Sequence, residues 1–503
     1  MSDMGEIAPG EKAQLIAYAD RFGGSLAGLH EILDGPLGGL FAGVHVLPFF
    51  TPFDGADAGF DPMDHTEVDP RLGSWDDVRA IAGDYALMVD LIVNHVSADS
   101  AQFRDVLARG DDSPYAGMFL TMSDVYPGGA SETELVGIYR PRLGLPFTAL
   151  TLGQRRRLVW TTFTSAQIDL NLFDPAGMAY LDRVLVALAA GGVSMVRLDA
   201  VGYAIKTAGT SSFMTTATLG FIDELTARAR KLGMQVLVEI HAHFERQIAI
   251  ASAVDRVYDF ALAPLLLHAL YTADAAPLRR WLAVRPTNAV TVLDTHDGIG
   301  VIDVGPDQMG DGRAGLLTPA QVDALVEAIH ERSGGQSRQA TGWAASNVDV
   351  YQVNCTYYDA LGRDDMAYLL ARAVQLFTPG IPQIYYVGLL AGHNDMDLVA
   401  RSGVGRDINR HVYAPDEIAR DLARPVVAAL VALIRFRNAH PGFAGHCEVG
   451  GDGSRVSLTW TAAGGQSTEL DADLATGRAP LVWTGPDGEA HTCHDLLEIH
   501  HGY

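Results

Sequence analysis

The chain has 503 residues, which exceeds the usual size of one domain and predicts a large core domain with additions. Hydrophobic residues make up 48% of it and charged residues 19%, as in ordinary folded soluble proteins. The net charge of -25 argues against nucleic acid or an anionic membrane surface as partner, and any anionic substrate would need local cations to hold it.

The cysteines and the apolar segments bear on where the protein works. Cys355, Cys447 and Cys493 are too few, and odd in number, for a disulfide framework, which favours a reducing compartment. The acidic N-terminus lacks the apolar core of a signal peptide. The most apolar stretch, 184–196, is short and interrupted by glycine, so it does not predict a membrane span. We therefore expect a soluble cytoplasmic protein.

Short β-branched apolar runs recur along the chain and many end in polar residues. They cover residues 14–18, 44–50, 85–93, 193–199, 235–240, 256–260, 289–294 and 381–387. Amphipathic stretches such as 221–232 and 365–377 separate several of them, with apolar residues repeating at three and four. Alternation of strands and helices predicts a parallel sheet, and eight such runs favour a (β/α)₈ TIM barrel over an open sheet.

Three segments do not fit the alternation. Residues 96–170, after the third strand, are rich in Gly, Pro, Ser and aromatic residues and predict an inserted subdomain. Residues 298–362, after the seventh strand, predict a second insertion with a helix near 319–332. After a closing helix at 424–438, the alternating runs 456–460 and 481–483 predict a small C-terminal β domain. The expected division is barrel 1–95, 171–297 and 363–442, insertions 96–170 and 298–362, and β domain 443–503.

Three strand ends each deliver an acid beside a basic or polar residue. These are Val196-Arg197-Leu198-Asp199, Val238-Glu239-Ile240-His241 and Leu293-Asp294-Thr295-His296-Asp297. One such acid could be a buried structural partner of an arginine, but three at one rim of a barrel indicate a catalytic site.

Retaining glycoside chemistry needs two carboxyl groups about 5–5.5 Å apart. Asp199 is the expected nucleophile, kept ionised by Arg197 on the same face of the strand. Glu239 is the expected general acid/base, with a raised pKa. Asp297 would stabilise the oxocarbenium-like ring, and His95 and His296 would donate to sugar hydroxyls.

With these residues in view, the chain resembles glycoside hydrolase family 13, the α-amylase superfamily, over residues 14–438. Asp90-Leu91-Ile92-Val93-Asn94-His95 and the three strand-end motifs carry this likeness. More specific segments are 52–61, 138–142, 256–267, 291–305 and 405–411, which are similar to the branch of the superfamily that cleaves sucrose with phosphate.

The resemblance implies a role for each matching residue. Asp57, His95, Arg197, His296 and Arg406 would hold the glucosyl unit. Phe60 would be an aromatic platform, and the remaining pocket lining would be Tyr139, Phe163, Gln167 and Tyr203. Fructose would meet Asp349, Tyr351 and Gln352, and phosphate would bind Arg142, Tyr351 and His241. Arginine can bind two phosphate oxygens at once, which fits an acidic protein that takes an anion.

The resemblance implies that sucrose and phosphate give α-D-glucose 1-phosphate and D-fructose through a glucosyl-enzyme. It implies no cofactor and no metal, calcium included. The partners are small molecules, and a homodimer is one assembly open to the chain.

The sequence leaves open which acceptor the enzyme uses. Ala242-His243-Phe244 and Trp343 depart from the family pattern near the acceptor side. Glucosylglycerol, glucosylglycerate or sucrose 6-phosphate phosphorolysis, transglucosylation and hydrolysis are therefore alternatives. A non-catalytic binding barrel is the alternative from another class, because a fold does not fix a function.

Overall fold

The computed structural model describes residues 7–55, 57–141, 144–307, 312–343, 352–485 and 488–501. Its centre is a closed barrel of eight parallel strands in the order β1-β16-β13-β12-β11-β10-β5-β2. The strands are β1 Gln14–Ala17, β2 Gly43–Val46, β5 Ala86–Ile92, β10 Met195–Asp199, β11 Gln235–Val238, β12 Arg256–Asp259, β13 Ala289–Thr291 and β16 Ile381–Tyr385. All eight predicted runs supply a barrel strand, so the predicted fold class is confirmed.

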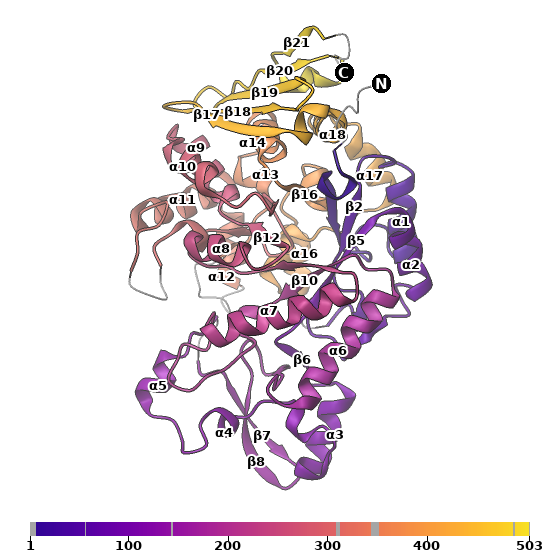
Figure 1. Ribbon diagram of the computed structural model, residues 1–503, viewed down its shortest axis with the longest axis vertical. Coiled ribbons are helices and arrows are strands. Elements are labelled where there is room, and N and C mark those ends of the chain that lie inside the picture. The colour runs from indigo at the N-terminus through magenta and orange to yellow at the C-terminus, as the bar shows by residue number, and fades with distance from the viewer. Residues whose placement is uncertain are drawn as a thin grey trace.

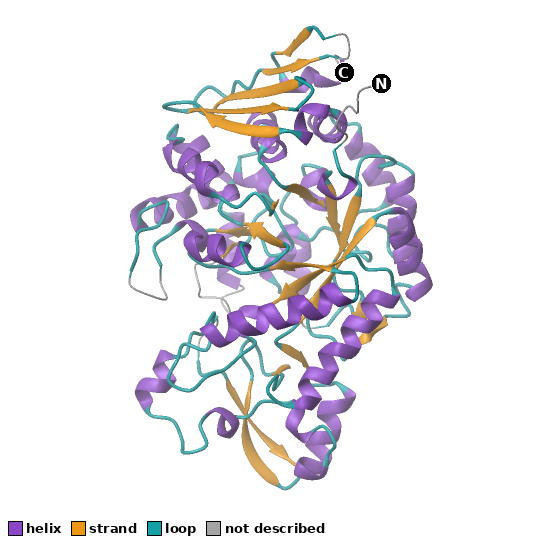
Figure 2. Cartoon of the chain, viewed as in Figure 1, coloured by secondary structure: helices purple, strands orange, loops and turns teal. Residues whose placement is uncertain are grey.

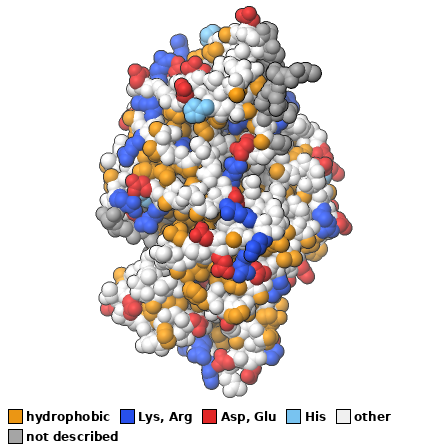
Figure 3. All heavy atoms as spheres, viewed as in Figure 1, with side chains coloured by type: hydrophobic (Ala, Val, Ile, Leu, Met, Phe, Trp, Pro, Cys, Tyr) orange, Lys and Arg blue, Asp and Glu red, His pale blue; other side chains and the backbone are white. Residues whose placement is uncertain are grey.

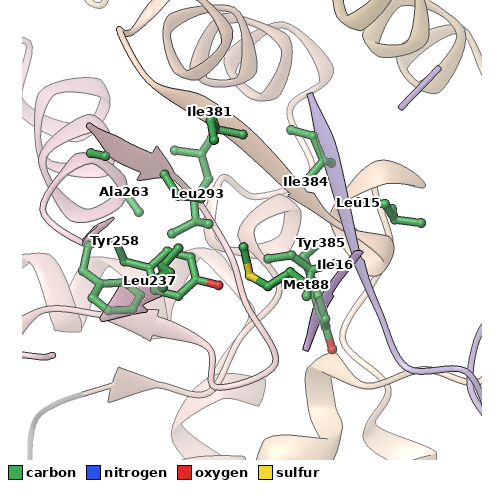
Figure 4. Packing of buried hydrophobic residues seen from close by; sticks show 14 of the residues in the cluster. Leu15, Ile16, Met88, Leu237, Tyr258, Ala263, Leu293, Ile381, Ile384 and Tyr385 are labelled. Carbon is green, nitrogen blue, oxygen red and sulfur yellow. The ribbon is translucent and has the colours of Figure 1, made fainter. Parts of the chain in front are cut away.

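The barrel closes between its first and last strands. Gln14 of β1 lies opposite Gly43 of β2 on one side and opposite Gln383 of β16 on the other. Buried apolar side chains from several strands fill the interior, and Figure 4 shows Met88 and Tyr258 directed towards the space between the strands. Both are at most 4% exposed. The interior is therefore a packed core, and the chemistry is left to the rim.

Helices surround the barrel, as the purple coils in Figure 2 show. Side-chain caps begin several of the longer ones: Asp174 caps α6 Pro175–Ala190, Thr318 caps α11 Pro319–Arg332 and Asp364 caps α14 Asp365–Phe377. The remaining barrel and rim helices are α1 Leu26–Asp34, α2 Trp75–Asp84, α7 Thr216–Lys231, α8 Phe244–Ala251, α9 Leu262–Thr272, α10 Ala276–Val284, α12 Gln336–Trp343, α13 Tyr357–Ala360, α15 Tyr386–Leu389, α16 Met396–Ser402, α17 Pro415–Leu422 and α18 Pro425–Ala439. No helix in these described ranges is long and apolar enough to cross a bilayer.

One predicted strand divides in two. The run 44–50 becomes β2 in the barrel and β3 Phe50–Thr51, which pairs with β4 Asp64–Val68 in a separate two-stranded sheet. Pro48 lies between the two pieces and has no N–H to donate to a ladder, which accounts for the break.

The segment after β5 projects from the barrel at the lower end of Figure 1. It holds the pair β6 His95–Ser97 and β9 Gln167–Asp169, the hairpin β7 Phe147–Leu152 and β8 Arg155–Trp160, and the helices α3 Ala101–Arg109, α4 Met122–Val125 and α5 Glu132–Gly137. Leu120, Tyr126, Ile138 and Trp160 form a small core of its own. β6 begins shortly after the end of β5, and β9 near the end of the segment pairs with β6. The segment therefore starts and finishes at the barrel rim.

Two further pieces complete the architecture. In the segment after β13, β14 Ile299–Gly300 pairs with β15 Gln352–Val353. At the other end of Figure 1, the C-terminal strands β17 His446–Gly450, β18 Arg455–Thr461, β19 Ser467–Asp473, β20 Leu481–Thr484 and β21 Ala490–Cys493 form an antiparallel sheet against α18. On the face drawn in Figure 3, acidic and basic side chains lie interspersed.

Candidate active site

The three predicted carboxylates meet at one rim of the barrel. β10 ends on Asp199, Glu239 directly follows β11, and Asp297 lies on the loop after β13. Parallel strands present their carboxyl ends on the same face, which brings these residues from distant parts of the sequence together. The pocket they share is lined by Asp57, Phe60, His95, Pro141, Phe163, Gln167, Asp199, Ala200, Gly202, Tyr203, Phe213, Glu239, Ile240, His241, His296, Asp297, Thr341, Gln352, Asn354 and Arg406.

A single guanidinium group lies beneath all three acids. Arg197 contacts Asp199 Oδ1 at 2.8 Å, Glu239 Oε1 at 3.5 Å and Asp297 Oδ2 at 3.9 Å. It is 2% exposed and also pairs with Asp90, at 2.5 Å, on the neighbouring strand. Arg197 therefore lies under the pocket floor, where it fixes the carboxylates more directly than it could reach a sugar.

The pKa of Asp199 is shifted in the direction opposite to the one expected from Arg197 alone. Burial, with the charges of Glu239, Asp90 and Asp297, raises the pKa of Asp199 well above its usual value, although Arg197 lowers it as predicted. Asp199 and Glu239 line the same pocket, so the charge of Glu239 disfavours the ionised form of Asp199.

Backbone geometry supports Glu239 from the opposite side. Ala200, immediately after Asp199, has a φ of 55°, which is uncommon for a residue with a side chain. In this conformation its N–H points to Glu239 Oε2 at 3.4 Å. The turn that ends β10 therefore links the two candidate catalytic residues.

Asp297 is held as a permanent anion. Burial alone would raise its pKa, but His296, Arg406 and Arg197 outweigh burial and keep that pKa well below the usual value. Arg406 approaches Asp297 Oδ1 at 3.1 Å and Asp57 Oδ1 at 3.7 Å, so one arginine spans a predicted catalytic acid and a predicted sugar-binding acid.

The predicted platform and histidines form one surface. Phe60 stacks on His296 with ring centroids 4.8 Å apart and an interplanar angle of 7°. Burial lowers the pKa of His296 to about 3 and also lowers that of His95, so both rings are neutral near pH 7. His95 Nε2 lies 3.1 Å from Gln167 Nε2 and 2.9 Å from the Phe60 carbonyl oxygen, which orients this side of the pocket.

Aromatic residues make the facing wall. Phe163 and Tyr203 line the pocket and meet edge to face, with centroids 5.2 Å apart. Tyr139 packs behind them, stacked on Tyr203 at 6.1 Å, and so supports the lining without joining it.

The acceptor side is described in part. His241 and Gln352 line the pocket, and their Nε2 atoms lie 3.0 Å apart. Arg142, Asp349 and Tyr351 fall outside the described residues, so their predicted contacts with phosphate and fructose stay predictions. The side chain of Trp343 is likewise outside the description.

Several residues near the site escaped the sequence reasoning. Phe213, Thr341 and Asn354 line the pocket from segments that carry no catalytic motif. Asp90, which holds Arg197, lies within a strand motif that could have indicated it. Asp303, beneath His241, and Lys206, behind the aromatic wall, have partners dozens of residues away, and no local pattern marks them.

One metal-competent group occurs among the described residues. His30, Asp34 and Asp84 bring ligand atoms within 4.8 Å of one another on the surface, and none of them lines the pocket. The pocket lining has four carboxylates, and Arg406 in the lining and Arg197 beneath it already neutralise acidic oxygens that a cation would need.

The likeness to known proteins covers nearly the whole chain. The α-amylase catalytic-domain model matches residues 17–427. A sucrose phosphorylase of Agrobacterium vitis is 58% identical over 477 residues, covering 94% of this chain and 97% of the relative. A sucrose phosphorylase of Bifidobacterium adolescentis is 52% identical over 495 residues, covering 97% and 98%.

A solved structure agrees with the fold. The crystal structure of a sucrose 6F-phosphate phosphorylase from Thermoanaerobacter thermosaccharolyticum superposes with a TM-score of 0.88. It shares 35% sequence identity and covers 98% of this chain and 100% of that one.

Proposed function

The chain belongs to the α-amylase family and, within it, to the sucrose phosphorylases, and on that premise we propose that it converts sucrose and phosphate into α-D-glucose 1-phosphate and D-fructose. The observation that carries the proposal is the arrangement of Asp199, Glu239 and Asp297 around the one buried guanidinium of Arg197. Two displacements at one carbon would give net retention of configuration.

In the first displacement, Asp199 attacks the anomeric carbon of the glucosyl unit. The bond from that carbon to the bridging oxygen breaks, and the protonated Glu239 gives its proton to the departing fructose. Arg197, at 2.8 Å from Asp199, favours the carboxylate form of the nucleophile that makes this attack.

In the second displacement, hydrogen phosphate attacks the same carbon from the side that fructose left. The bond to Asp199 breaks and restores its carboxylate, and the phosphate proton passes to Glu239. Charge is conserved, since one carboxylate is consumed and one is released. The acid is thereby recharged for the next sucrose.

Asp297 stabilises the oxocarbenium-like ring in the transition state of each step. It carries a fixed negative charge held by Arg406 at 3.1 Å and is 13% exposed on its side chain, so little water screens it. Asp57, Arg406, His95, Gln167 and His296 surround the glucosyl hydroxyls. Phe60 supports the flat, oxocarbenium-like ring from below.

Phosphate binding needs positive charge on the acceptor side. His241 is the described candidate there, with Arg142 and Tyr351 as its proposed partners. Gln352 and Asp349 would meet fructose. The alternatives are phosphorolysis of glucosylglycerol, glucosylglycerate or sucrose 6-phosphate. The sucrose 6F-phosphate phosphorylase, at 35% identity, shows how similar in structure a relative with another substrate can be.

The protein is incubated with sucrose, with and without phosphate, and glucose 1-phosphate, fructose and glucose are quantified. We expect glucose 1-phosphate and fructose in equal amounts, and only slow release of glucose without phosphate. Fructose release that does not depend on phosphate, without glucose 1-phosphate, contradicts the proposal. In the reverse direction, the protein is given glucose 1-phosphate with fructose, glycerol, glycerate or fructose 6-phosphate. The rates of phosphate release rank these acceptors.

Asp199→Ala tests the assignment of the nucleophile. It should lower kcat by about a thousandfold or more, since no carboxylate remains to form the intermediate. Asp182→Ala, which removes an acid on α6 that pairs with Arg228, is the matched control and should keep full turnover. Equal activity of the two variants would place the chemistry elsewhere.

Compartment and assembly complete the proposal. The three cysteines, all within the described residues, are unpaired, which supports a reducing compartment such as the cytoplasm. We also propose a homodimer, and light scattering on the purified chain measures it directly.

A further inference from the structure

Asp303 is a fully buried acid that lies against the active site without lining it. It belongs to the short 3₁₀ helix Ile302–Val304 in the segment after β13 and is 0% exposed. Its Oδ2 lies 3.0 Å from His241 Nδ1. Its Oδ1 accepts hydrogen bonds from the backbone N–H of Ala242, at 3.1 Å, and from Gln247 Nε2, at 2.7 Å.

Contacts at both ring nitrogens and on one face hold the His241 ring in place. Phe260 stacks on one face with centroids 4.0 Å apart and an interplanar angle of 21°. Nδ1 faces Asp303, and Nε2 faces the pocket, 3.0 Å from Gln352 Nε2 and 3.7 Å from Glu239 Oε1. Gly300 makes room for this contact, because a Cβ there would lie 3.2 Å from Asp303 Oδ2 and 3.3 Å from His241 Cε1.

We propose that Asp303 is a positioning residue that, through His241, favours phosphate over water as the acceptor of the glucosyl unit. The inference rests on the proposed function and deepens it. It concerns which molecule attacks the glucosyl-enzyme, and it leaves the formation of that intermediate to Asp199 and Glu239.

The carboxylate of Asp303 fixes the tautomer of the ring. An acceptor at 3.0 Å keeps the hydrogen on Nδ1, so a neutral His241 presents the lone pair of Nε2 to the pocket. A lone pair repels a phosphate oxygen, whereas the N–H of the imidazolium binds it. The charge of His241 therefore decides whether this wall of the pocket accepts an anion.

The surrounding charges favour the imidazolium. Burial lowers the pKa of His241, but Asp303 first, then Glu239 and Asp297, outweigh burial and raise it above the usual value. Phe260 and Gln352, which also contact the ring in the described part of the chain, carry no charge. As pH rises through the raised pKa, His241 loses its charge and the use of phosphate should fall.

Asp303→Asn removes the charge while keeping the size of the side chain. The Asn oxygen can still accept from Ala242 and Gln247, which turns its NH₂ towards Nδ1 of His241. The ring then loses the charge that stabilises its imidazolium and offers only a neutral Nε2–H, which binds a phosphate dianion more weakly than the imidazolium does. We expect the alkaline limb of kcat/KM for phosphate to move to lower pH by about one unit, and the ratio of glucose 1-phosphate to glucose to fall about tenfold. The pH profile of hydrolysis in the absence of phosphate should move much less.

Asp307→Asn is the matched control. Asp307 is an acid of the same segment whose side chain is 1% exposed, and it pairs with Arg246 at 3.1 Å and Arg313 at 3.0 Å. This variant should lose stability as Asp303→Asn does, without changing the product ratio or the pH profile. An equal change in both variants overturns the proposal, because it would then reflect general loosening of the segment.

The double variant His241→Gln/Asp303→Asn, compared with His241→Gln alone, tests whether Asp303 acts through His241. If Asp303 acts through His241, its removal should change the product ratio little in the His241→Gln background. An undiminished effect there also overturns the proposal. A wild-type protein that makes no glucose 1-phosphate would instead contradict the proposed function, so the two failures are distinguishable.

Discussion

The ammonium group of Lys206 joins three parts of the active-site wall. It contacts Asp169 Oδ2 at 2.5 Å and Asn94 Oδ1 at 2.5 Å, with 1% of its side chain exposed. Asn94 precedes His95, and Asp169 accepts from the N–H and Oγ1 of Thr162, next to Phe163. A buried charge pair of this kind contributes mainly by holding its neighbours in one arrangement.

Lys206→Met should destabilise the protein by about 3–5 kcal/mol, because it leaves Asp169 buried without its counter-charge. Chemical unfolding measures the loss, and kcat/KM for sucrose should fall with it as Phe163 and His95 lose their support. Lys231→Met, an exposed change in the last turn of α7, is the control and should alter neither quantity.

The double variant Lys206→Met/Asp169→Asn provides the critical comparison. Neutralising Asp169 should recover part of the lost stability, since the uncompensated charge is then gone. If the double variant is less stable than Lys206→Met by the full cost of Asp169→Asn alone, the two residues do not act as a pair.

At the scale of secondary structure, the sequence predicts where strands begin better than where they end. The run 289–294 starts correctly, but β13 stops at Thr291. Asp294 turns away to pair with the buried Arg372, 2.8 Å from each of its oxygens. The last residues of such a run leave the strand because their hydrogen-bond partners lie in other elements. The local sequence pattern does not contain those partners.

The same reasoning separates the predictable part of the site from the rest. Asp199 and Glu239 follow from acids at the ends of apolar strands, a pattern that is local in the sequence. Asp303 and Lys206 depend on contacts across 62 and 112 positions, so they became visible only in the folded chain. A buried charge needs a partner, but only the folded structure shows which residues partner Asp303 and Lys206.

The loop that carries Asp297 is supported by the helix α15. A Cβ added to Gly388 of that helix would lie 2.1 Å from Arg372 Nη2 and 2.2 Å from Asp294 Oδ2. Gly388→Ala should therefore displace the Arg372–Asp294 pair, lower the free energy of unfolding by about 1–3 kcal/mol and reduce kcat. Thermal unfolding and turnover of sucrose measure both effects.

Gly220→Ala is the matched change in another helix. Gly220 lies on the exposed side of α7 with nothing within 4 Å of an added Cβ. There the substitution should stabilise the protein by about 0.8–1 kcal/mol and leave turnover unchanged. A stabilised, fully active Gly388→Ala would show that the ion pair tolerates the methyl group.

At the scale of the whole molecule, the barrel and the C-terminal sheet share one core. Trp460 of β18 is 7% exposed, donates from Nε1 to the Phe377 carbonyl at 2.7 Å, and packs against Phe443. Its buried neighbours belong to the same hydrophobic cluster as the barrel strands. The sheet thus covers the closing helices.

Trp460→Ala should lower the free energy of unfolding by about 3–5 kcal/mol through the cavity it leaves. Because the core is continuous, we expect the barrel and the sheet to unfold together in one transition at a lower denaturant concentration. Tryptophan fluorescence and enzyme activity measure this transition. Leu158→Ala, at a side chain 44% exposed, is the control. Two separate transitions would mean that the sheet folds on its own.

The closure of the barrel by β1 and β16 has a consequence for synthesis on the ribosome. β1 is finished at residue 17, yet its second neighbour begins at residue 381. At about 5–20 residues per second, the ribosome needs roughly 20–70 s to make the strand that covers that edge. For that time a buried, apolar strand has one row of unpaired amides, so the growing chain depends on something else to shield the edge.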